Sequence, residues 1–297
     1  MKKSICLLLA VFTVLIGAVC ATAQNQPQLP KVLWIYREDA KPARGAAHAR
    51  VEHGFAQYWA KNKVQPFLGM EAVSGNATEV MFFSGYDSMA AMEKDFQTFG
   101  KASTGAEYDA LEKQEAELVN SVRSTVAMFR PDLSYHADRF MSVLPQSRYF
   151  AIETFRVRLG KDADFEAGSK SFQSAFEKMK REQPYAVYQV IMGAPEGTYL
   201  LIEPLKSFKD IDDSFASMGA MVQAMGEDNF KNMMKGTGDV FTSMESNVYS
   251  FNPNMSNVPK EMAALDPKFW TPKPMVKRAP APKKDAAAKP ATVGKTQ

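Results

Sequence analysis

The sequence predicts an α+β fold in which two tandem βαββαβ units pack their sheets together within one chain. Three observations predict it: a repeat over most of the chain, the same order of helix and strand patterns in both copies, and strands that are apolar on consecutive residues. The repeat is plainest where FRPDLS at 129–134 returns as FNPNMS at 251–256, 122 residues later. Internal similarity of this kind is typical of a duplicated domain.

The offset between the two copies drifts slowly along the chain. It is 122 residues near the end of each copy, 119 where FFSGYDSM (82–89) meets LIEPLKSF (201–208), and 117 where Phe55 meets Phe172. The order of the matched segments stays the same throughout. Small loop insertions after a duplication explain this drift, and chance matching does not.

Each copy has the same succession of strand-like runs and helical stripes. In the first copy, the patterns predict strands at 32–38, 67–73, 79–85 and 124–129 and helices over 51–59, 89–99 and 108–122. In the second copy, they predict strands at 149–157, 185–192, 198–204 and 246–251 and helices over 165–179, 208–225 and 230–244. This order, with an extra helix before the last strand, is the ferredoxin-like unit.

The strands of both copies lack the alternation of apolar and polar residues that is expected when one face of a sheet is exposed to solvent. A ferredoxin-like sheet carries helices on one face only. Runs such as VLWIY, VMFF and YLLI are nevertheless apolar on consecutive residues, which requires cover on both faces. The sheet of the other copy can supply that cover. We therefore expect an intramolecular α/β barrel made of two ferredoxin-like units.

Composition divides the chain into five segments. We predict a signal peptide at 1–23, a first ferredoxin-like repeat at 24–135, a connector at 136–147, a second repeat at 148–257, and a Pro/Ala/Lys-rich disordered tail at 258–297. The formal net charge of +3 is unevenly distributed, because the last 27 residues carry seven basic residues and one acidic residue. The repeats are acidic as a result, which argues against nucleic-acid binding. The basic tail either contacts an anionic envelope surface or is simply solvated.

The first residues have the features of a secretory signal. Two lysines precede an apolar run that is shorter than the roughly 20 residues of a membrane span, and a small-x-small site predicts cleavage after Ala23. Lipidation of Cys20 is a competing interpretation, disfavoured because Val19 stands where a small residue is wanted. Both cysteines, Cys6 and Cys20, lie in the removed segment. We expect a periplasmic or secreted protein without a membrane span or a mature thiol.

The element order, together with MESNVYSFNP (244–253) after the extra helix, resembles the dimeric α/β-barrel superfamily in tandem single-chain form and looks most like its NIPSNAP-like branch. The resemblance covers most of residues 31–256. It implies a pocket between each sheet and its helices. The superfamily includes cofactor-independent monooxygenases, haem-binding and haem-degrading enzymes, small-molecule isomerases and members with no known reaction. The resemblance therefore leaves the reaction open.

We predict an exported protein that binds a small, largely apolar molecule. The candidate ligand-binding residues, an apolar lining with a few polar groups, are Trp34, Tyr36, His48, Tyr188 and Glu203. One alternative is a cofactor-independent oxygenase- or isomerase-like enzyme, whose catalytic residues the sequence does not identify. Another is an envelope protein-interaction module. A homodimer is left open.

Three further side-chain patterns bear on chemistry. Haem-carrying relatives need an axial ligand, for which only His48 is plausible, but a lone histidine is more often structural, so no cofactor is predicted. Met218, Met221 and Met225 share a helix face that would suit Cu(I), but core packing explains them better, and no metal is predicted. Burial of Glu203 in an apolar strand would raise its pKa, as a general base requires. A salt bridge to Arg156 or another cation is the plainer explanation.

Overall fold

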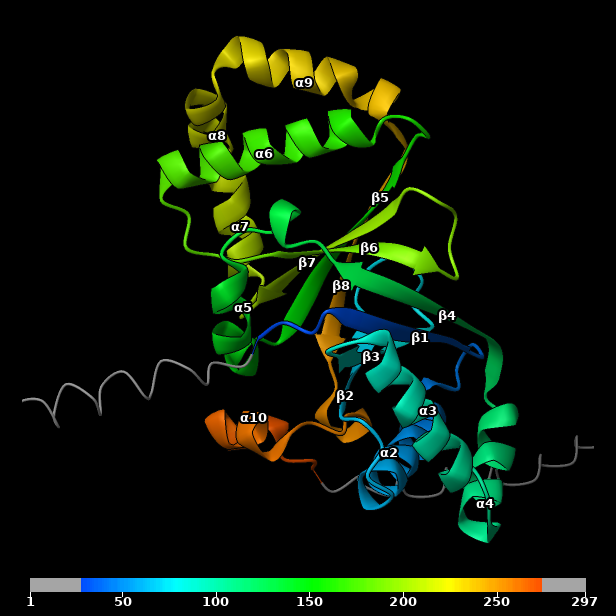
Figure 1. Ribbon diagram of the computed structural model, residues 1–297. Coiled ribbons are helices and arrows are strands. Elements are labelled where there is room, and N and C mark those ends of the chain that lie inside the picture. The colour runs from blue at the N-terminus through cyan, green and yellow to red at the C-terminus, as the bar shows by residue number, and fades with distance from the viewer. Residues whose placement is uncertain (1–27, 274–297) are drawn as a thin grey trace, which may run out of the picture.

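The computed structural model describes residues 28–273 (Figure 1). The predicted signal peptide, its cleavage site, Cys20 and the last part of the predicted tail lie outside these residues. Eight strands close into one antiparallel barrel in the order β1-β3-β2-β8-β5-β7-β6-β4. This ring divides into β4-β1-β3-β2 and β8-β5-β7-β6, each of which is the strand order of one ferredoxin-like unit. The predicted fold class, two such units in an intramolecular α/β barrel, is confirmed.

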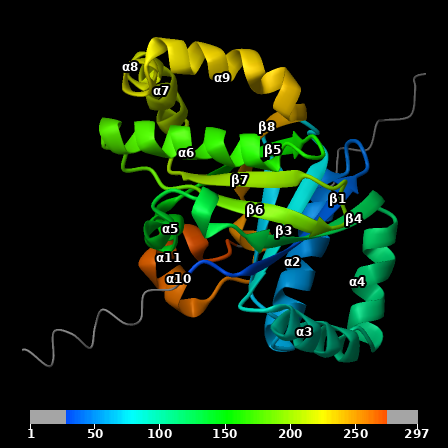
Figure 2. The ribbon, with the colours of Figure 1, turned by 45° about the horizontal axis from the view of Figure 1, so that its top comes forward.

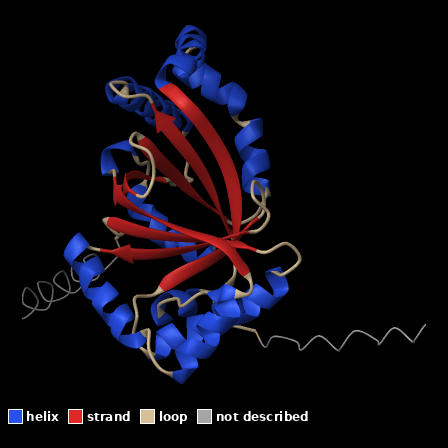
Figure 3. Ribbon diagram, turned by 90° about the vertical axis from the view of Figure 1, so that its right-hand side faces the viewer, coloured by secondary structure: helices blue, strands red, loops and turns tan. Residues whose placement is uncertain are grey.

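Each unit places its helices on the outer face of its own half of the barrel. The first unit consists of β1 (Val32–Ala40), α2 (Gly45–Lys61), β2 (Phe67–Ala72), β3 (Glu79–Tyr86), α3 (Met89–Ala102), α4 (Ala106–Ala116) and β4 (Val119–Phe129). The second consists of β5 (Tyr149–Val157), α6 (Asp162–Met179), β6 (Ala186–Met192), β7 (Thr198–Leu205), α7 (Lys209–Ala216), α8 (Met218–Met225), α9 (Glu227–Val240) and β8 (Phe241–Phe251). The two helical layers lie on opposite sides of the barrel (Figures 1 and 3).

Both faces of each strand are apolar because one face lines the interior of the barrel and the other lies beneath the helices. On β1, Leu33 and Ile35 point into the barrel, where they join the central core with residues of all the other strands. Trp34 and Tyr36, at the alternate positions, point outward beneath the helices of the first unit. The interior of the barrel is thus the shared core that the consecutive apolar residues predict.

The repeated FxPxxS motif ties the two units together. It follows the last strand of each unit, and its proline opens a short 3-10 turn, η1 (Pro131–Leu133) or η3 (Pro253–Met255). The hydroxyl of Ser134 accepts a hydrogen bond at 2.8 Å from the backbone N–H of Val187 on β6, in the other unit. The hydroxyl of Ser256 accepts one at 2.8 Å from Gly69 on β2, again in the other unit. The motif therefore closes each seam of the barrel, β4–β6 and β2–β8.

The last strands begin earlier than predicted. Val122 and Met244, which continue the apolar stripes of the preceding helices, lie in β4 and β8 instead. Their side chains are about half exposed, at 54% and 50%. Val122 pairs with Glu38, so the beginning of β4 is held by the far end of β1. The predicted helix at 208–225 is also two helices, α7 and α8, which meet at Ser217.

The connector and the residues after β8 cover one end of the barrel. The connector forms α5 (Ala137–Val143) and η2 (Leu144–Gln146), and the chain after β8 adds α10 (Lys260–Leu265) and α11 (Pro267–Trp270) beside them (Figure 2). Trp270 is 1% exposed, and its indole N–H donates to the carbonyl of Pro145 at 2.8 Å. The prediction of a disordered tail from residue 258 is therefore wrong for 258–273, where apolar side chains pack on the core. None of the helices between residues 28 and 273 is long and apolar enough to cross a bilayer.

Candidate functional site

A cavity of about 600 Å³ lies between the outer face of the first unit's sheet and the helices α2, α3 and α4. Its walls are mainly aromatic: Trp34, Tyr36, Phe55, Trp59, Phe67, Phe82, Phe96, Phe99 and Tyr108. The rings contact one another, with centroids 4.5 Å apart for Trp59 and Phe99 and 5.0 Å apart for Trp34 and Phe96. A concave, apolar site of this volume is typical of small-molecule binding.

Regular periodicity places these side chains around the cavity. Alternate residues of β1 face outward, so Trp34, Tyr36 and Glu38 follow one another along the floor. The helices contribute residues three or four positions apart, which share one face of a helix. Those from α2 and α4 that line the cavity are Glu52, Phe55, Trp59, Tyr108, Glu112 and Glu115. β1, α2 and α4 therefore each contribute both aromatic rings and carboxyl groups to the cavity wall.

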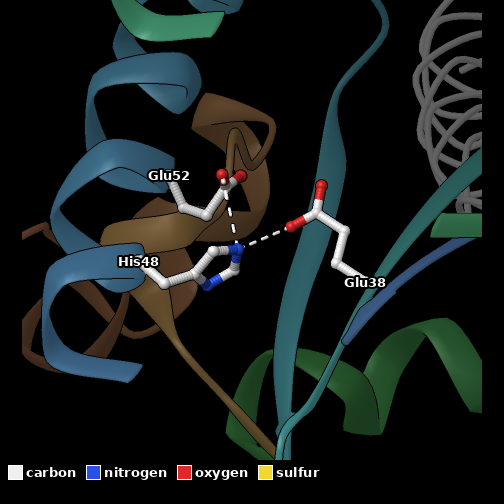
Figure 4. A group of neighbouring side chains, drawn as sticks. All are labelled: Glu38, His48 and Glu52. Carbon is white, nitrogen blue, oxygen red and sulfur yellow. Dashed lines mark hydrogen bonds and ion pairs between the residues drawn. The ribbon is translucent and has the colours of Figure 1, made fainter. Parts of the chain in front are cut away.

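The floor of the cavity ends at a buried polar cluster, which we call the Glu38–His48–Glu52 cluster (Figure 4). Nε2 of His48 lies 2.7 Å from Oε2 of Glu38, a hydrogen bond, and 3.8 Å from Oε1 of Glu52. Glu38 comes from β1, while His48 and Glu52 are one turn apart on α2. All three residues are buried, with exposed fractions of 2%, 1% and 6%. Both carboxyl groups converge on the same nitrogen.

Glu52 is the unusual member of the cluster. Its Oε1 is buried and has no hydrogen-bond partner among the described residues. Burial raises the pKa of Glu52 well above its ordinary value, and the negative charges of Glu38 and Glu115 raise it further. Burial likewise raises the pKa of Glu115 to about 8, with the charge and hydrogen bonding of Glu38 adding to the effect. The carboxyl groups outnumber the one imidazole that could balance their charge.

The second unit has no such cluster at the positions that correspond to Glu38, His48 and Glu52. The strands β1 and β5, and the helices α2 and α6, start 117 residues apart. Glu38 and His48 therefore correspond to Phe155 and Phe165, whose ring centroids are 5.9 Å apart. Glu52 corresponds to Ser169. Packed rings satisfy the fold here, so the polar cluster of the first unit is not a requirement of the architecture.

Three of the five predicted ligand-binding residues belong to this site. Trp34 and Tyr36 line the cavity. His48 lies behind its floor, bonded to Glu38. An axial role for His48 on haem would therefore require this hydrogen bond to break. Burial raises the pKa of Tyr36, and the nearby carboxylates add to the shift, so its hydroxyl stays protonated.

The other two predicted residues lie elsewhere. Tyr188 points into the barrel at a separate cavity of about 270 Å³, and its hydroxyl donates to the carbonyl of Pro30 at 2.9 Å. Glu203, in the second unit, accepts from the guanidinium of Arg181 at 2.5 Å. Burial raises the pKa of Glu203, and Arg181 opposes that shift. The five residues do not share one pocket, and ligand contact by any of them remains a prediction.

Glu38, Glu52 and Glu115 are not among the site residues predicted from the sequence. The first two leave a signal in the sequence: Glu38 follows an apolar strand run, and Glu52 stands four residues after His48, on the same helix face. Glu115 leaves none, because it reaches the cluster only through the packing of α4 on α2. Core packing explains Met221 and Met225, which are buried beside α6, but not Met218, which is 48% exposed.

We expect Glu115 to make stability depend on pH. Its pKa is about 8 in the folded chain and near 4.5 when unfolded, so the folded state retains a proton that the unfolded state releases. Stability therefore falls as the pH rises from about 4.5 to about 8. Over this pH range, the free energy of unfolding of Glu115→Gln should fall by about 1–2 kcal/mol less than that of the unmodified chain. This estimate is smaller than the full pKa shift implies, because Glu115 is partly exposed to solvent. Urea unfolding between about pH 5 and 9 measures it.

Glu93→Gln is the matched control, because Glu93 is exposed on α3. It should leave the pH profile of the unfolding midpoint as it is in the unmodified chain. Profiles that are parallel for Glu115→Gln and the unmodified chain would show that Glu115 titrates as it does in water.

No family model matches this chain, and no curated protein matches it. Among solved structures, it is similar to an anthrone oxidase-like protein, with a TM-score of 0.47 at 10% identity over 74% of this chain and 91% of the other. A candidate monooxygenase from Lactobacillus acidophilus gives 0.46 at 8% identity over 75% and 94%. A mutant chlorite dismutase from Candidatus Nitrospira defluvii gives 0.45 at 8% identity over 80% and 95%. All three TM-scores are below 0.5, and the α/β-barrel assignment rests on the strand order described above.

Proposed function

We propose that this protein binds a small, largely apolar molecule in the cavity of the first unit, with a polar group of that molecule directed at the Glu38–His48–Glu52 cluster. The observation that carries the proposal is the aromatic-walled cavity of about 600 Å³ that ends at this cluster. The rings would bury the apolar body of a ligand, and the carboxyl groups would fix its orientation. Three further properties remain predictions: that the chain belongs to the NIPSNAP-like branch, that it is exported to the periplasm, and that it forms a homodimer.

The first experiment is native mass spectrometry of the purified chain, with an absorbance spectrum of the same sample. We expect a co-purifying organic mass, which would identify the ligand class. A Soret band would instead identify haem. If only the mass of the protein is seen, the ligand is bound weakly. The fluorescence of an added apolar probe would then decide whether the cavity binds small molecules.

A matched pair of variants tests the location of the site. Phe96 on α3 lines the cavity, and its counterpart in the second unit, 119 residues later, is Phe215 on α7, which is 73% exposed. Phe96 is 40% exposed, and a bound ring would cover part of that surface. Phe96→Ala should therefore weaken binding of the probe N-phenyl-1-naphthylamine about tenfold, because such a contact contributes of order 1–2 kcal/mol. Phe215→Ala should leave it unchanged. Equal affinities for both variants would contradict binding in this cavity.

A second candidate function, an oxygenase- or isomerase-like enzyme, is favoured by one observation. Glu52 is buried, lines the cavity and has a raised pKa, which suits a carboxyl group that exchanges a proton with a substrate. With a substrate in hand, Glu52→Gln separates the two functions. An enzyme would lose kcat while substrate affinity persists, whereas a binding protein would change in affinity alone.

A further inference from the structure

We infer that the Glu38–His48–Glu52 cluster is a binding site for a divalent transition-metal ion, reached from the cavity of the first unit. Glu115, which lines the same cavity beside Glu38, is placed to act as a fourth ligand. The site does not depend on the proposed organic ligand, and it is tested with metal ions alone.

The donor atoms already surround a common point. One atom from each of Glu38, His48 and Glu52 lies within 4.8 Å of the other two. Metal–ligand bonds of about 2.0–2.2 Å place the donors around a shared ion roughly 3–3.5 Å apart. The separations from His48 Nε2, 2.7 Å to Glu38 and 3.8 Å to Glu52, lie on either side of that range. Shifts of about half an ångström would bring each of these two carboxyl oxygens to that distance from the nitrogen.

The cluster also contains a donor atom without a partner. Oε1 of Glu52 is buried and accepts no hydrogen bond from the described residues, although a buried polar atom left unpaired is destabilising. It is directed toward His48 Nε2, on the same side as the carboxyl of Glu38 (Figure 4). A metal ion between these three atoms would supply the missing partner.

The balance of charge favours a cation of more than one charge. Glu38 and Glu52 both face the imidazole of His48, and none of the described residues that line the cavity is Lys or Arg. Ionisation of both buried carboxyl groups around one imidazole is unfavourable unless a further positive charge offsets them. A divalent ion supplies that charge without adding a side chain.

In the second unit, mainly apolar side chains occupy the positions of this cluster. Phe155, Phe165 and Ser169 occupy the positions of Glu38, His48 and Glu52. Buried charged groups can often be replaced by well-packed apolar residues without loss of stability. The presence of three ionisable groups at these positions in one unit alone therefore indicates a role other than packing.

The donor set selects the class of metal. An imidazole nitrogen with carboxylate oxygens suits Zn²⁺, Mn²⁺ or Fe²⁺, whereas Mg²⁺ and Ca²⁺ prefer oxygen ligands throughout, and Cu(I) prefers sulfur. Because Glu38 and Glu52 line the cavity, an ion held between them would have its remaining positions toward that space. The polar group of a bound molecule, or water, would fill them.

Isothermal titration of the purified, untagged and chelator-treated protein with ZnCl₂ tests the site. We expect one ion per chain, with affinity at least about tenfold weaker in Glu38→Gln and in Glu52→Gln, because each removes a charged ligand but keeps its shape. Glu153→Gln is the matched control, because Glu153 is a half-buried glutamate on β5 of the second unit and lies outside the cluster. It should bind Zn²⁺ as the unmodified chain does.

Cobalt provides a second readout that does not depend on heat. Co²⁺ bound by the cluster should give visible d–d absorption bands that Glu52→Gln abolishes while circular dichroism shows the variant to be folded. Absence of both Zn²⁺ heat and Co²⁺ bands would overturn the site, as would Zn²⁺ binding that is equally strong in Glu38→Gln and Glu52→Gln. Because no organic ligand is present, these outcomes are distinguishable from loss of probe binding in metal-free protein.

Discussion

Replacement of His48 by alanine is expected to lower the free energy of unfolding by about 3–5 kcal/mol at neutral pH. The substitution removes the hydrogen bond to Glu38, which is only 2% exposed, and leaves two carboxyl groups facing an empty space. Removal of one partner from a buried polar pair is destabilising chiefly because the other partner stays buried without compensation. Urea unfolding at pH 7, compared with the unmodified chain, measures the loss.

The second unit provides the control for this prediction. The triple substitution Glu38→Phe, His48→Phe and Glu52→Ser copies Phe155, Phe165 and Ser169 into the first unit. It should be at least as stable as the unmodified chain, and up to about 4 kcal/mol more stable, since apolar packing replaces buried charge. If His48→Ala unfolded at the same urea concentration as the unmodified chain, the polar pair would contribute nothing to the fold.

Trp270→Ala should destabilise the protein to a similar extent, by about 3–5 kcal/mol. The indole is 1% exposed, contacts Phe251 with ring centroids 5.5 Å apart, and donates a hydrogen bond to Pro145. Its removal would open a cavity at the end of the barrel and leave the carbonyl of Pro145 without this partner. The unfolding midpoint in urea is the measurement, with the slope of the transition checked for a change in mechanism.

Leu265→Ala is the control for the same segment, because Leu265 on α10 is 63% exposed. It should change stability by no more than about 0.5 kcal/mol. Compared with a chain that ends at 273, one that ends at 257 should lose as much stability as Trp270→Ala causes, or more. Equal stability of both truncated chains would show that α10 and α11 do not support the barrel.

The sequence was sufficient for the fold because the repeat gives each element twice. The order of strands and helices, and apolar residues on both strand faces, predict the closed barrel without any knowledge of register. The end of the second unit was harder, because Trp270 stands among prolines and lysines that resemble a disordered tail. The starts of β4 and β8 were also missed, because Val122 and Met244 continue a helical stripe while strand pairing holds them in the barrel.

The candidate site was only half predictable. Trp34 and Tyr36 follow from their position on the first strand, and both line the cavity. The grouping with Tyr188 and Glu203 failed because a strand that is apolar on both faces does not reveal which residues point inward. Tyr188 points into the barrel, whereas Glu203 faces the helices of the second unit.

The presence of both units in one chain has a consequence for how such a site can arise. In a barrel assembled from two identical chains, every substitution is made twice, and a charge placed under one helical layer is also placed under the other. In this protein, by contrast, a change in one codon alters only one of the two units of the barrel. Phe155 and Phe165 can remain as a packed and stable half while Glu38 and His48 take on chemistry in the other. Fusion thus separates the half that maintains the fold from the half that is free to acquire a function.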